Sequence, residues 1–308
     1  MNKELSIVIP AYKANFLSAA LDSIAAQTSL EFTLYIGDDC SPYHLEDIVN
    51  QYRELINIVY KRFDTNLGGK DLVAQWERCI AMTQGEPYIW LFSDDDMMEP
   101  RCVEEFLKLS KEEKDNYLIH FDINMIDNKG SILKSHNPYP KIQTAKEYLD
   151  GKLFEKRNIS YVVEFVFSRD LYNKCHGFQN FDLAWGSDFV TWVKMAGECK
   201  GILSLSGDKC RVLWRSSDQN ISPNKSKPIL MRKLNATIDT FAYIKKWLCQ
   251  HGYKYSFKYS KYVWGEIKRS RALLDLSDIE ALNEKYQEKI GSTLLSRLSY
   301  ILCKYYYK

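Results

Sequence analysis

Short apolar segments alternate with amphipathic segments along the N-terminal part of this chain. Runs rich in β-branched and aromatic residues predict buried strands, whereas apolar residues spaced three and four apart predict helices. The predicted strands cover residues 5–9, 32–36, 56–60 and 88–92, and the predicted helices cover residues 16–27, 45–55 and 71–82. Strands and helices that alternate at this pace indicate an α/β fold with a mostly parallel sheet flanked by helices.

Polar clusters follow three of these predicted strands at the point where each strand ends. They are Pro10-Ala11-Tyr12 after the first strand, Asp38-Asp39 after the second, and Ser93-Asp94-Asp95-Asp96 after the fourth. Ligands of such sheets bind at the carboxyl ends of the strands, so we expect the clusters to line one crevice. An aromatic ring can pack on a base, a carboxylate can accept a hydrogen bond from an imide or a ribose, and a metal ion can hold a pyrophosphate. The set therefore indicates a site for a nucleotide that carries a leaving group.

The three adjacent carboxylates Asp94, Asp95 and Asp96 repel one another and cost stability, which a bound cation would relieve. Mg²⁺ and Mn²⁺ take oxygen ligands, and Mg²⁺ is commonly held by one or two carboxylates plus the phosphates of a substrate. The alternative is a solvated acidic turn that caps the helix expected to begin near Pro100. The recurrence of polar clusters at strand ends favours the metal site over the helix cap.

At this point the chain resembles the family 2 glycosyltransferases, which have the GT-A fold, over residues 4–222. The motifs that carry the resemblance are Ser6 to Tyr12 with Gln27-Thr28, Asp38-Asp39-Cys40-Ser41, Gly85 to Ile89 followed by Ser93-Asp94-Asp95-Asp96 and Pro100, Trp185-Gly186-Ser187-Asp188-Phe189, and Arg215 to Ser222. The third motif is similar to the DXD-type metal motif of the family, and the last two motifs match more loosely than the first three.

The resemblance implies how the first two clusters bind a nucleotide sugar. Pro10, Ala11 and Tyr12 would contact it, with Tyr12 beside the uracil, and Asp39 would bind the imide edge of that base. Asp38 has an alternative role in packing or in capping the loop that follows it.

The resemblance also implies roles for the acidic residues. Asp94 would lie near the ribose or a phosphate, and Asp95 would be the direct ligand of Mn²⁺ or Mg²⁺. Asp96 would be a second metal ligand or, alternatively, an outer carboxylate that caps a helix. Asp188 would be the general base that accepts the proton of the acceptor.

Two basic residues match positions that contact the donor in the family, and two positions depart from the family pattern. Arg215 would contact the nucleotide sugar, and Lys70 falls near the usual place of a basic diphosphate contact, although it also fits a solvated surface position. Ser187 stands where the family often has an acidic residue, and Ser217 stands where it often has a histidine. Both departures bear on how strongly the site binds a metal.

The resemblance implies a GT-A catalytic domain over residues 1–222 and leaves residues 223–308 as a basic, aromatic-rich helical extension. The implied activity is metal-dependent, inverting transfer of a sugar from a nucleotide sugar, with a UDP-sugar as the expected donor. The expected acceptor is a hydroxyl of a glycan or lipid-linked glycan in bacterial surface polysaccharide synthesis. Two alternatives are a sugar nucleotidyltransferase, which should carry a glycine-rich loop after the first strand, and a non-catalytic binder or membrane-associated scaffold.

The net charge of +2 conceals an asymmetry between the two regions. Residues 225–308 hold 17 Lys and Arg against 7 Asp and Glu, a net +10, whereas the first 224 residues hold 25 against 33, a net −8. The acidic front part argues against nucleic acid as a partner, because it repels phosphate except at a metal ion.

Near the end of the chain, apolar residues form a helical stripe. They are Leu294, Leu295, Leu298, Ile301, Leu302 and Tyr305. Arg297, Lys304 and Lys308 lie off this stripe. A basic amphipathic helix of this kind either lies on an anionic membrane surface or docks on the catalytic domain, and both interpretations stay open.

The first residues lead directly into a strand without a signal peptide, and no apolar stretch is long enough to span a membrane. The eight cysteines are scattered without a CxxC pair, which indicates reduced thiols. We therefore expect a cytoplasmic protein, held peripherally on the inner face of the cytoplasmic membrane if its last helix binds lipid.

Overall fold

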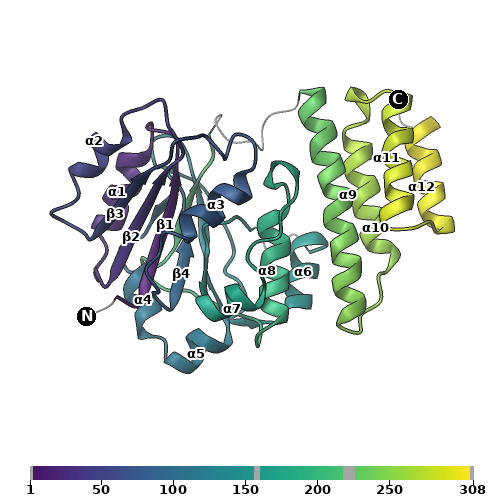
Figure 1. The fold of residues 1–308 in the computed structure, drawn as a ribbon. Coiled ribbons are helices and arrows are strands. Elements are labelled where there is room, and N and C mark those ends of the chain that lie inside the picture. Colours follow the sequence, from purple (N-terminus) through teal and green to yellow (C-terminus); the bar gives the residue numbers. More distant parts are fainter. Residues whose placement is uncertain (1–2, 156–159, 218–225, 306–308) are drawn as a thin grey trace. The chain divides into compact units, whose positions relative to one another are not determined.

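The computed structural model describes residues 3–155, 160–217 and 226–305 and divides into two compact units (Figure 1). Unit 1 comprises residues 1–178 and 191–218 and contains the strands. Unit 2 comprises residues 179–190 and 219–308 and is helical. The segment 179–190, which the sequence analysis placed in the catalytic domain, therefore groups with the C-terminal helices.

Unit 1 is built on an eight-stranded sheet with the strand order β3-β2-β1-β4-β10-β6-β11-β9. Its strands are β1 (Leu5–Ala11), β2 (Phe32–Asp38), β3 (Ile58–Arg62), β4 (Tyr88–Leu91), β6 (Leu118–Phe121), β9 (Ile142–Gln143), β10 (Phe165–Ser168) and β11 (Ile202–Leu205). Neighbouring strands from β3 to β4 are parallel, whereas β10 runs antiparallel to both β4 and β6. The predicted mostly parallel sheet is confirmed.

A second sheet of four strands has the order β5-β12-β7-β8. Its strands are β5 (Met97–Met98), β7 (Ile123–Ile126), β8 (Ile132–Ser135) and β12 (Val212–Arg215). Strand β5 follows the acidic turn 93–96 directly, and β12 pairs with it. The acidic turn thus connects the last parallel strand of the large sheet to the edge of the small one.

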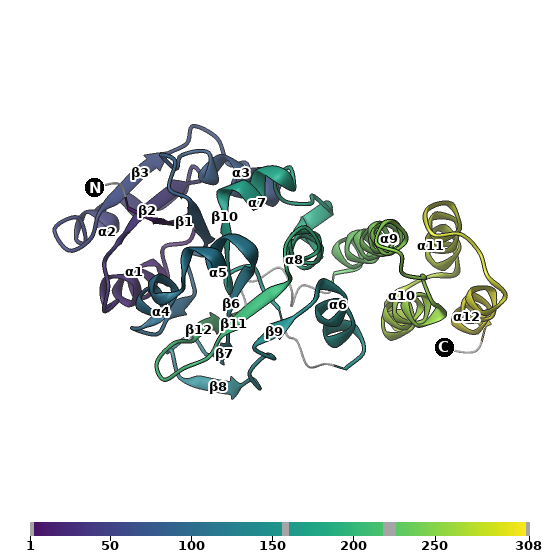
Figure 2. The same cartoon turned by 90° about the horizontal axis from the view of Figure 1, so that it is seen from below.

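Helices pack on both faces of the large sheet, with α1 and α4 on one face and α3 and α7 on the other (Figure 2). The helices of this part of the chain are α1 (Leu17–Ala25), α2 (Leu45–Asn50), α3 (Leu72–Ile80), α4 (Cys102–Lys108), α5 (Lys111–Asn116), α6 (Ala145–Leu153), α7 (Arg169–Lys174) and α8 (Ser187–Gly197). Buried apolar residues of α1, α2 and α4 and of the strands form a continuous core that includes Leu21, Ile24, Trp90 and Phe106.

The predicted strands and helices are present, with boundaries that shift by one to five residues. Helix α2 ends at Asn50 instead of residue 55, because residues 51–55 form turns. Strand β3 runs to Arg62 instead of residue 60, because it pairs with β2 along its whole length, up to Arg62 opposite Asp38. Lys61 and Arg62 are exposed polar residues on this edge strand, so the apolar pattern did not include them.

Unit 2 contains four long helices, which Figure 2 shows almost end-on. They are α9 (Lys227–Gln250), α10 (Phe257–Arg269), α11 (Leu276–Lys289) and α12 (Leu294–Tyr305). Apolar side chains on α9, α10 and α11, such as Phe241, Val263 and Leu282, are buried among them. The described residues include no helix that is long and apolar enough to cross a bilayer.

Candidate active site

The register of the large sheet brings the three polar clusters to one edge of unit 1. Ala11 at the end of β1 lies opposite Asp38 at the end of β2, and the Asp39 N–H donates to the Ala11 carbonyl over 2.8 Å. On the other side of β1, the Phe92 N–H donates to the Val8 carbonyl over 2.8 Å, which places the acidic turn beside the same strand end. The three polar clusters therefore lie at adjacent strand ends of the sheet.

Tyr12 and Asp94 form the first contact across this edge. One carboxylate oxygen of Asp94, Oδ2, accepts hydrogen bonds from the backbone N–H groups of Tyr12 and Lys13, each over 2.7 Å. Asp94 thereby fixes the turn that follows β1. The Tyr12 side chain remains 41% exposed, so its ring is accessible to a ligand, whereas Ala11 beside it is fully buried.

Lys13 supplies a cation to the acidic turn. Its ammonium lies 2.5 Å from Oδ2 of Asp95, while Oδ1 of Asp95 accepts a hydrogen bond from the Ser93 hydroxyl over 2.9 Å. Sequence reasoning missed Lys13, because a single lysine after a strand has no pattern that distinguishes it from a surface lysine. Only its position beside the three carboxylates in the folded protein shows that it offsets their negative charge.

Asp96 and Arg215 join the acidic turn to strand β12. The backbone N–H of Arg215 donates to Asp96 over 2.6 Å, and its guanidinium Nε donates to the carbonyl of Asp95 over 2.7 Å. The guanidinium also donates to the Asp127 carbonyl over 2.7 Å and lies 4.5 Å from the ring centroid of Phe16. These contacts bury Arg215. Its guanidinium could contact the donor only by giving up one of its present hydrogen bonds to the carbonyls of Asp95 and Asp127.

Burial and mutual repulsion shape the electrostatics of the turn. Burial first, and then the charge of Asp95, raise the pKa of Asp94 to about 6 and the pKa of Asp96 to about 8. Burial alone would lower the pKa of Lys13, but the charges of Asp95, Asp94 and Asp96 outweigh it, and the pKa lies above its ordinary value. One lysine thus faces three carboxylates, and the turn favours additional positive charge.

Asp39 holds the loop that follows β3. Its carboxylate accepts hydrogen bonds from the N–H groups of Leu67 and Gly68 over 2.7 and 2.8 Å and forms an ion pair with Arg78. A Cβ atom at Gly68 would lie 2.7 Å from Asp39, so a glycine is required at this close approach. Lys70 lies exposed in the same loop. The structure therefore places Asp39 and Lys70 on neighbouring segments.

Asp38 has the packing and capping contacts that were considered for it. It is fully buried and accepts hydrogen bonds from the Ser41 N–H over 2.7 Å, from the Tyr60 hydroxyl over 2.6 Å and from Arg62 over 2.8 Å. The Ser41 hydroxyl in turn donates to the Tyr12 carbonyl over 2.6 Å. Asp38 thus supports the position of Tyr12 through the loop after β2.

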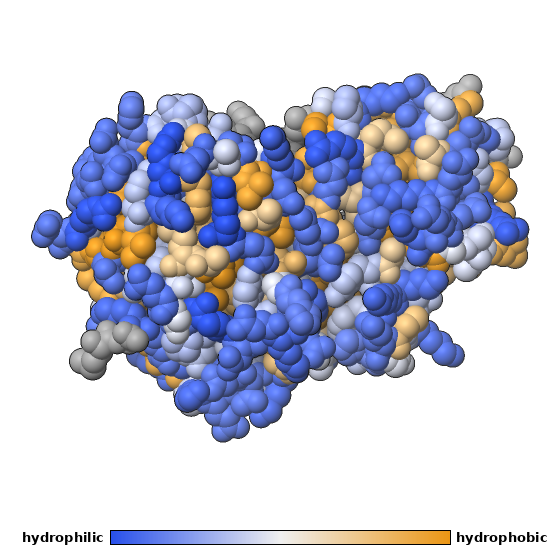
Figure 3. All heavy atoms as spheres, in the orientation of Figure 1, coloured by the Kyte–Doolittle hydropathy of each residue, from blue (hydrophilic) through white to orange (hydrophobic). Residues whose placement is uncertain are grey.

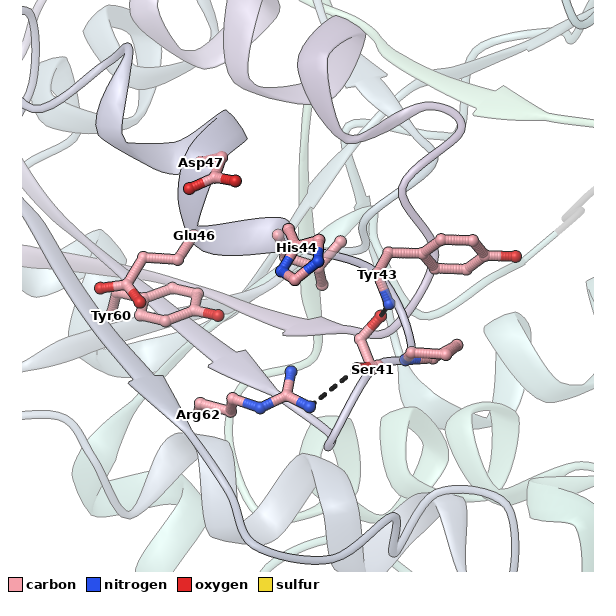
Figure 4. A pocket seen from close by; sticks show the side chains of 9 residues that line it. Ser41, Tyr43, His44, Glu46, Asp47, Tyr60 and Arg62 are labelled. Atoms are coloured by element: carbon pink, nitrogen blue, oxygen red, sulfur yellow. Dashed lines mark hydrogen bonds between the residues drawn. The ribbon is translucent and has the colours of Figure 1, made fainter.

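A cavity of about 270 Å³ lies beside this loop (Figure 4). Figure 4 shows Tyr43, His44, Tyr60 and Arg62 around it, with Arg62 donating to the Ser41 carbonyl. Its lining comes from residues 41–47, Tyr60 and Arg62, and none of the predicted site residues is part of that lining. The cavity belongs to the wall that supports Tyr12.

The predicted base Asp188 lies in unit 2, in the first turn of α8. The backbone before it is strained, because Leu183 and Ala184 have φ angles of 58° and 52°, in the left-handed region. Residues in such conformations cost free energy, persist only where their surroundings hold them, and cluster at functional sites. This strained segment, residues 182–186, is called the base loop below.

Helix α9 holds the base loop in place. Arg232 forms two hydrogen bonds of 2.8 and 2.6 Å with the carboxylate of Asp182, and the Trp185 indole N–H donates to the Thr237 hydroxyl over 3.2 Å. The ammonium of Lys233 lies 4.8 Å from the centre of the Trp185 ring. Sequence reasoning did not connect α9 to the predicted base, because the contacts join segments about fifty residues apart.

In the described residues, no three His, Cys, Asp or Glu side chains are placed to hold a metal ion by themselves. Each carboxylate of the acidic turn already has protein partners, and Asp95 is the one whose oxygens face only the Lys13 ammonium and the Ser93 hydroxyl. Hard oxygen donors of this kind suit Mg²⁺ or Mn²⁺ when a substrate supplies the remaining ligands. The residues therefore fit a metal held by Asp95 together with a diphosphate.

Comparison with known structures shows the GT-A fold of glycosyltransferases. The crystal structure of residues 1–349 of Staphylococcus aureus TarS in complex with UDP-GlcNAc matches with a TM-score of 0.58, at 15% identity over 98% of this chain and 93% of that chain. The mannosyltransferase PcManGT from Pyrobaculum calidifontis, in complex with GDP-Man and Mn²⁺, matches with a TM-score of 0.53, at 12% identity over 99% and 86%.

The chain belongs to glycosyl transferase family 2, whose family model matches residues 6–174. An uncharacterized glycosyltransferase of Rickettsia typhi is 31% identical over 155 residues, which are 49% of this chain and 45% of that protein. TarS, a poly(ribitol-phosphate) β-N-acetylglucosaminyltransferase, is 31% identical over 96 residues, which are 30% of this chain and 16% of TarS. The chain thus spans less than half the length of these two relatives.

The first prediction concerns the charge of the acidic turn. Folding raises the pKa of Asp96 above the unfolded value of about 3.9, so the stability that the protonated carboxyl contributes is lost as the pH rises through about 8. The Asp96→Asn variant cannot ionise, keeps an acceptor for the Arg215 N–H and offers an N–H to Ser93. In the presence of a chelator, its melting temperature relative to wild type should rise by at least about 3 °C between pH 6 and pH 9. A difference that stays constant with pH would contradict the raised pKa.

The second prediction concerns the base loop. Gly186 has a φ of +85°, and an added Cβ would lie 2.7 Å from the Thr240 hydroxyl on α9. Gly186→Ala should cost about 1–2 kcal/mol for the left-handed backbone and about 1–3 kcal/mol more for the steric conflict, measured by urea unfolding. Gly252→Ala is the matched control, because its φ is +76° and nothing lies within 4 Å of its Cβ. Equal losses in both variants would show that α9 does not pack tightly on the loop.

Proposed function

We propose that this chain is a metal-dependent, inverting glycosyltransferase that moves a sugar from a nucleotide sugar, with a UDP-sugar as donor, to a hydroxyl of a glycan or lipid-linked acceptor. The observation that carries the proposal is the acidic turn 93–96 beside the exposed Tyr12 at the carboxyl edge of a parallel sheet. Membership of family 2 and the UDP-GlcNAc bound to TarS support the class of donor.

The proposal assigns the nucleotide to the edge formed by β1 and β2. Pro10, Ala11 and Tyr12 form its wall, with the Tyr12 ring against the uracil. Asp39 offers a carboxylate lone pair to the imide of the base while it keeps its backbone contacts, since a carboxylate accepts up to about four hydrogen bonds. Lys70, exposed in the loop that Asp39 holds, contacts the diphosphate.

Four residues of the turn and of β12 serve the diphosphate and the metal. Asp95 is the metal ligand, Asp94 lies near the ribose or phosphate, and Asp96 and Arg215 hold the turn that presents them. A bound Mn²⁺ or Mg²⁺ offsets the negative charge that develops on the leaving diphosphate. A metal ion held by Asp95 would compete with the Lys13 ammonium for that carboxylate, and Lys13 would then place its positive charge on the diphosphate.

The transfer itself uses Asp188. The acceptor hydroxyl gives its proton to the Asp188 carboxylate as its oxygen attacks the anomeric carbon in line. The bond from that carbon to the diphosphate oxygen breaks through an oxocarbenium-like transition state, and the nucleoside diphosphate leaves with the bonding electrons. The configuration at the anomeric carbon is inverted, because attack and departure occur on opposite faces.

The acceptor is proposed from the charge of the helical unit. A growing bacterial surface glycan on a lipid carrier would be used in the cytoplasm, at the inner face of the cytoplasmic membrane. The anionic lipids of that face attract residues 225–308, which carry a net charge of +10.

The experiment that tests the whole proposal is a donor screen with and without Mn²⁺. A panel of UDP-GlcNAc, UDP-Glc, UDP-GalNAc and GDP-Man should show one donor whose binding raises the melting temperature and whose hydrolysis requires the metal. Metal-dependent binding without hydrolysis or transfer to any acceptor would support a non-catalytic binder instead. Release of pyrophosphate from a nucleoside triphosphate and a sugar phosphate would support a nucleotidyltransferase.

The third prediction separates the roles of Asp95 and Lys13. Asp95→Asn should abolish metal-dependent turnover and leave the fold intact, because the amide keeps the shape but loses the charge. Lys13→Met should bind Mn²⁺ more tightly without donor, as read by the Mn²⁺ electron paramagnetic resonance signal, because the competing ammonium is gone. Its KM for the donor should rise, because the diphosphate loses a cation. Unchanged Mn²⁺ affinity in Lys13→Met would refute the competition between Lys13 and the metal ion for Asp95. Full activity of Asp95→Asn would refute the role of Asp95 as a metal ligand.

The fourth prediction concerns the base. Asp188→Asn keeps the size of the side chain but cannot accept a proton, so it should slow transfer by roughly 10²-fold or more and leave donor affinity nearly unchanged. Glu198→Gln is the control, because this substitution removes the same negative charge from an exposed residue just beyond the end of α8. A parallel fall of donor affinity and rate in Asp188→Asn would assign that residue to binding or structure.

A further inference from the structure

The last helix packs on unit 2 through its small and polar side. Ser296 and Cys303 are the buried residues of α12, at 3% and 2% exposure. The Cys303 thiol donates to the Trp264 carbonyl on α10 over 3.7 Å, and the Cys303 carbonyl accepts from Arg271 over 3.0 Å. Helix α12 is therefore docked through the side that carries Ser296, Cys303 and Tyr300, whose ring centroid lies 5.9 Å from that of Trp264.

The apolar stripe of α12 faces away from these contacts and is exposed. Figure 3 shows hydrophobic side chains at the edge of the molecule where Figure 1 draws α12. The exposed fractions are 76% for Leu294, 47% for Leu295 and Leu298, 41% for Ile301, 42% for Leu302 and 61% for Tyr305. A continuous apolar face of this kind on a soluble surface marks an interaction site.

The helical region that carries this face is basic, with 17 Lys and Arg against 7 Asp and Glu over residues 225–308. Lys261 and Lys268 are exposed on α10, three positions before and four positions after Trp264, whose carbonyl contacts α12. Arg297 is exposed on α12 itself. The neighbouring acidic groups are matched, because Glu280 pairs with Lys304 and Glu266 pairs with Arg269. A second copy of the chain would bring the same positive excess, whereas an anionic surface complements it.

We infer that the exposed face of α12 binds the surface of an anionic bilayer, with its leucines and isoleucine in the acyl boundary and Lys261, Lys268 and Arg297 among the head groups. Amphipathic helices with a basic border lie in the membrane interface in this way. Within the described residues of unit 2 the apolar stripe is exposed, which favours the membrane interpretation of this helix over the docked one. The inference stands on unit 2 alone and does not depend on the transfer reaction.

The test is sedimentation of the full chain with vesicles, without donor or metal. Vesicles with about 30% phosphatidylglycerol in phosphatidylcholine should bind it, pure phosphatidylcholine should bind it far less, and salt should weaken the binding. Leu298→Asp and Ile301→Asp should each lower the partition coefficient roughly tenfold or more, because each removes apolar contact and adds a repelled charge. The double variant Lys261→Gln, Lys268→Gln should reduce the preference for anionic over neutral vesicles.

Leu55→Asp is the matched control, because Leu55 is 57% exposed in unit 1, and it should bind vesicles as wild type does. Circular dichroism and donor hydrolysis should be unchanged in all these variants, so a loss of vesicle binding is separable from a failure of the proposed enzyme. Failure of wild type to bind anionic vesicles would overturn the inference. A wild-type dimer that Leu298→Asp converts to a monomer in solution would also overturn it, because a second copy would then cover the face.

Discussion

The ion pair of Lys13 with Asp95, in a turn of three adjacent carboxylates, governs the structure around the proposed active site. Lys13 neutralises part of the charge on the turn 93–96, and the backbone N–H groups of Tyr12, Lys13 and Arg215 neutralise more of it by hydrogen bonding. Even with these partners, burial and the charge of Asp95 raise the pKa of Asp94 to about 6 and the pKa of Asp96 to about 8, so Asp96 carries a proton at neutral pH. The same contacts join β1 of the large sheet to β12 of the small sheet, so the turn is a structural joint as well as the proposed ligand site.

This double use explains why the acidic residues are not equivalent. Asp94 and Asp96 each direct a carboxylate oxygen at a backbone N–H, and their loss would loosen a strand end. Asp95 contacts only side chains, which can rotate away when a ligand arrives. Two carboxylates fixed by the backbone and a third with exchangeable partners suit the proposed binding of a diphosphate together with a metal ion.

Much of the fold and part of the site follow from local pattern. The alternation of apolar runs and amphipathic segments predicted the sheet, and the acidic residues at strand ends predicted its edge. The partners of those residues could not be predicted in this way. Arg78 reaches Asp39, and Arg215 reaches the acidic turn, from positions far along the chain, and only the packed structure decides which exposed-looking cation meets which carboxylate. The helix at residues 294–305 was predicted, but the direction of its apolar side was not. Amphipathicity alone does not say whether protein or a membrane covers that side.

The attachment of the base loop to α9 has a consequence for how such proteins can be recombined. Thr237 and Arg232 hold Trp185 and Asp182, so the helices after residue 226 are part of the framework of the residue proposed to take the proton. An exchange of the C-terminal helices between relatives would carry over a membrane preference only together with the α9 surface that shapes this loop. The helical extension is therefore not an interchangeable module, and relatives with differing tails should also differ in the segment before α8.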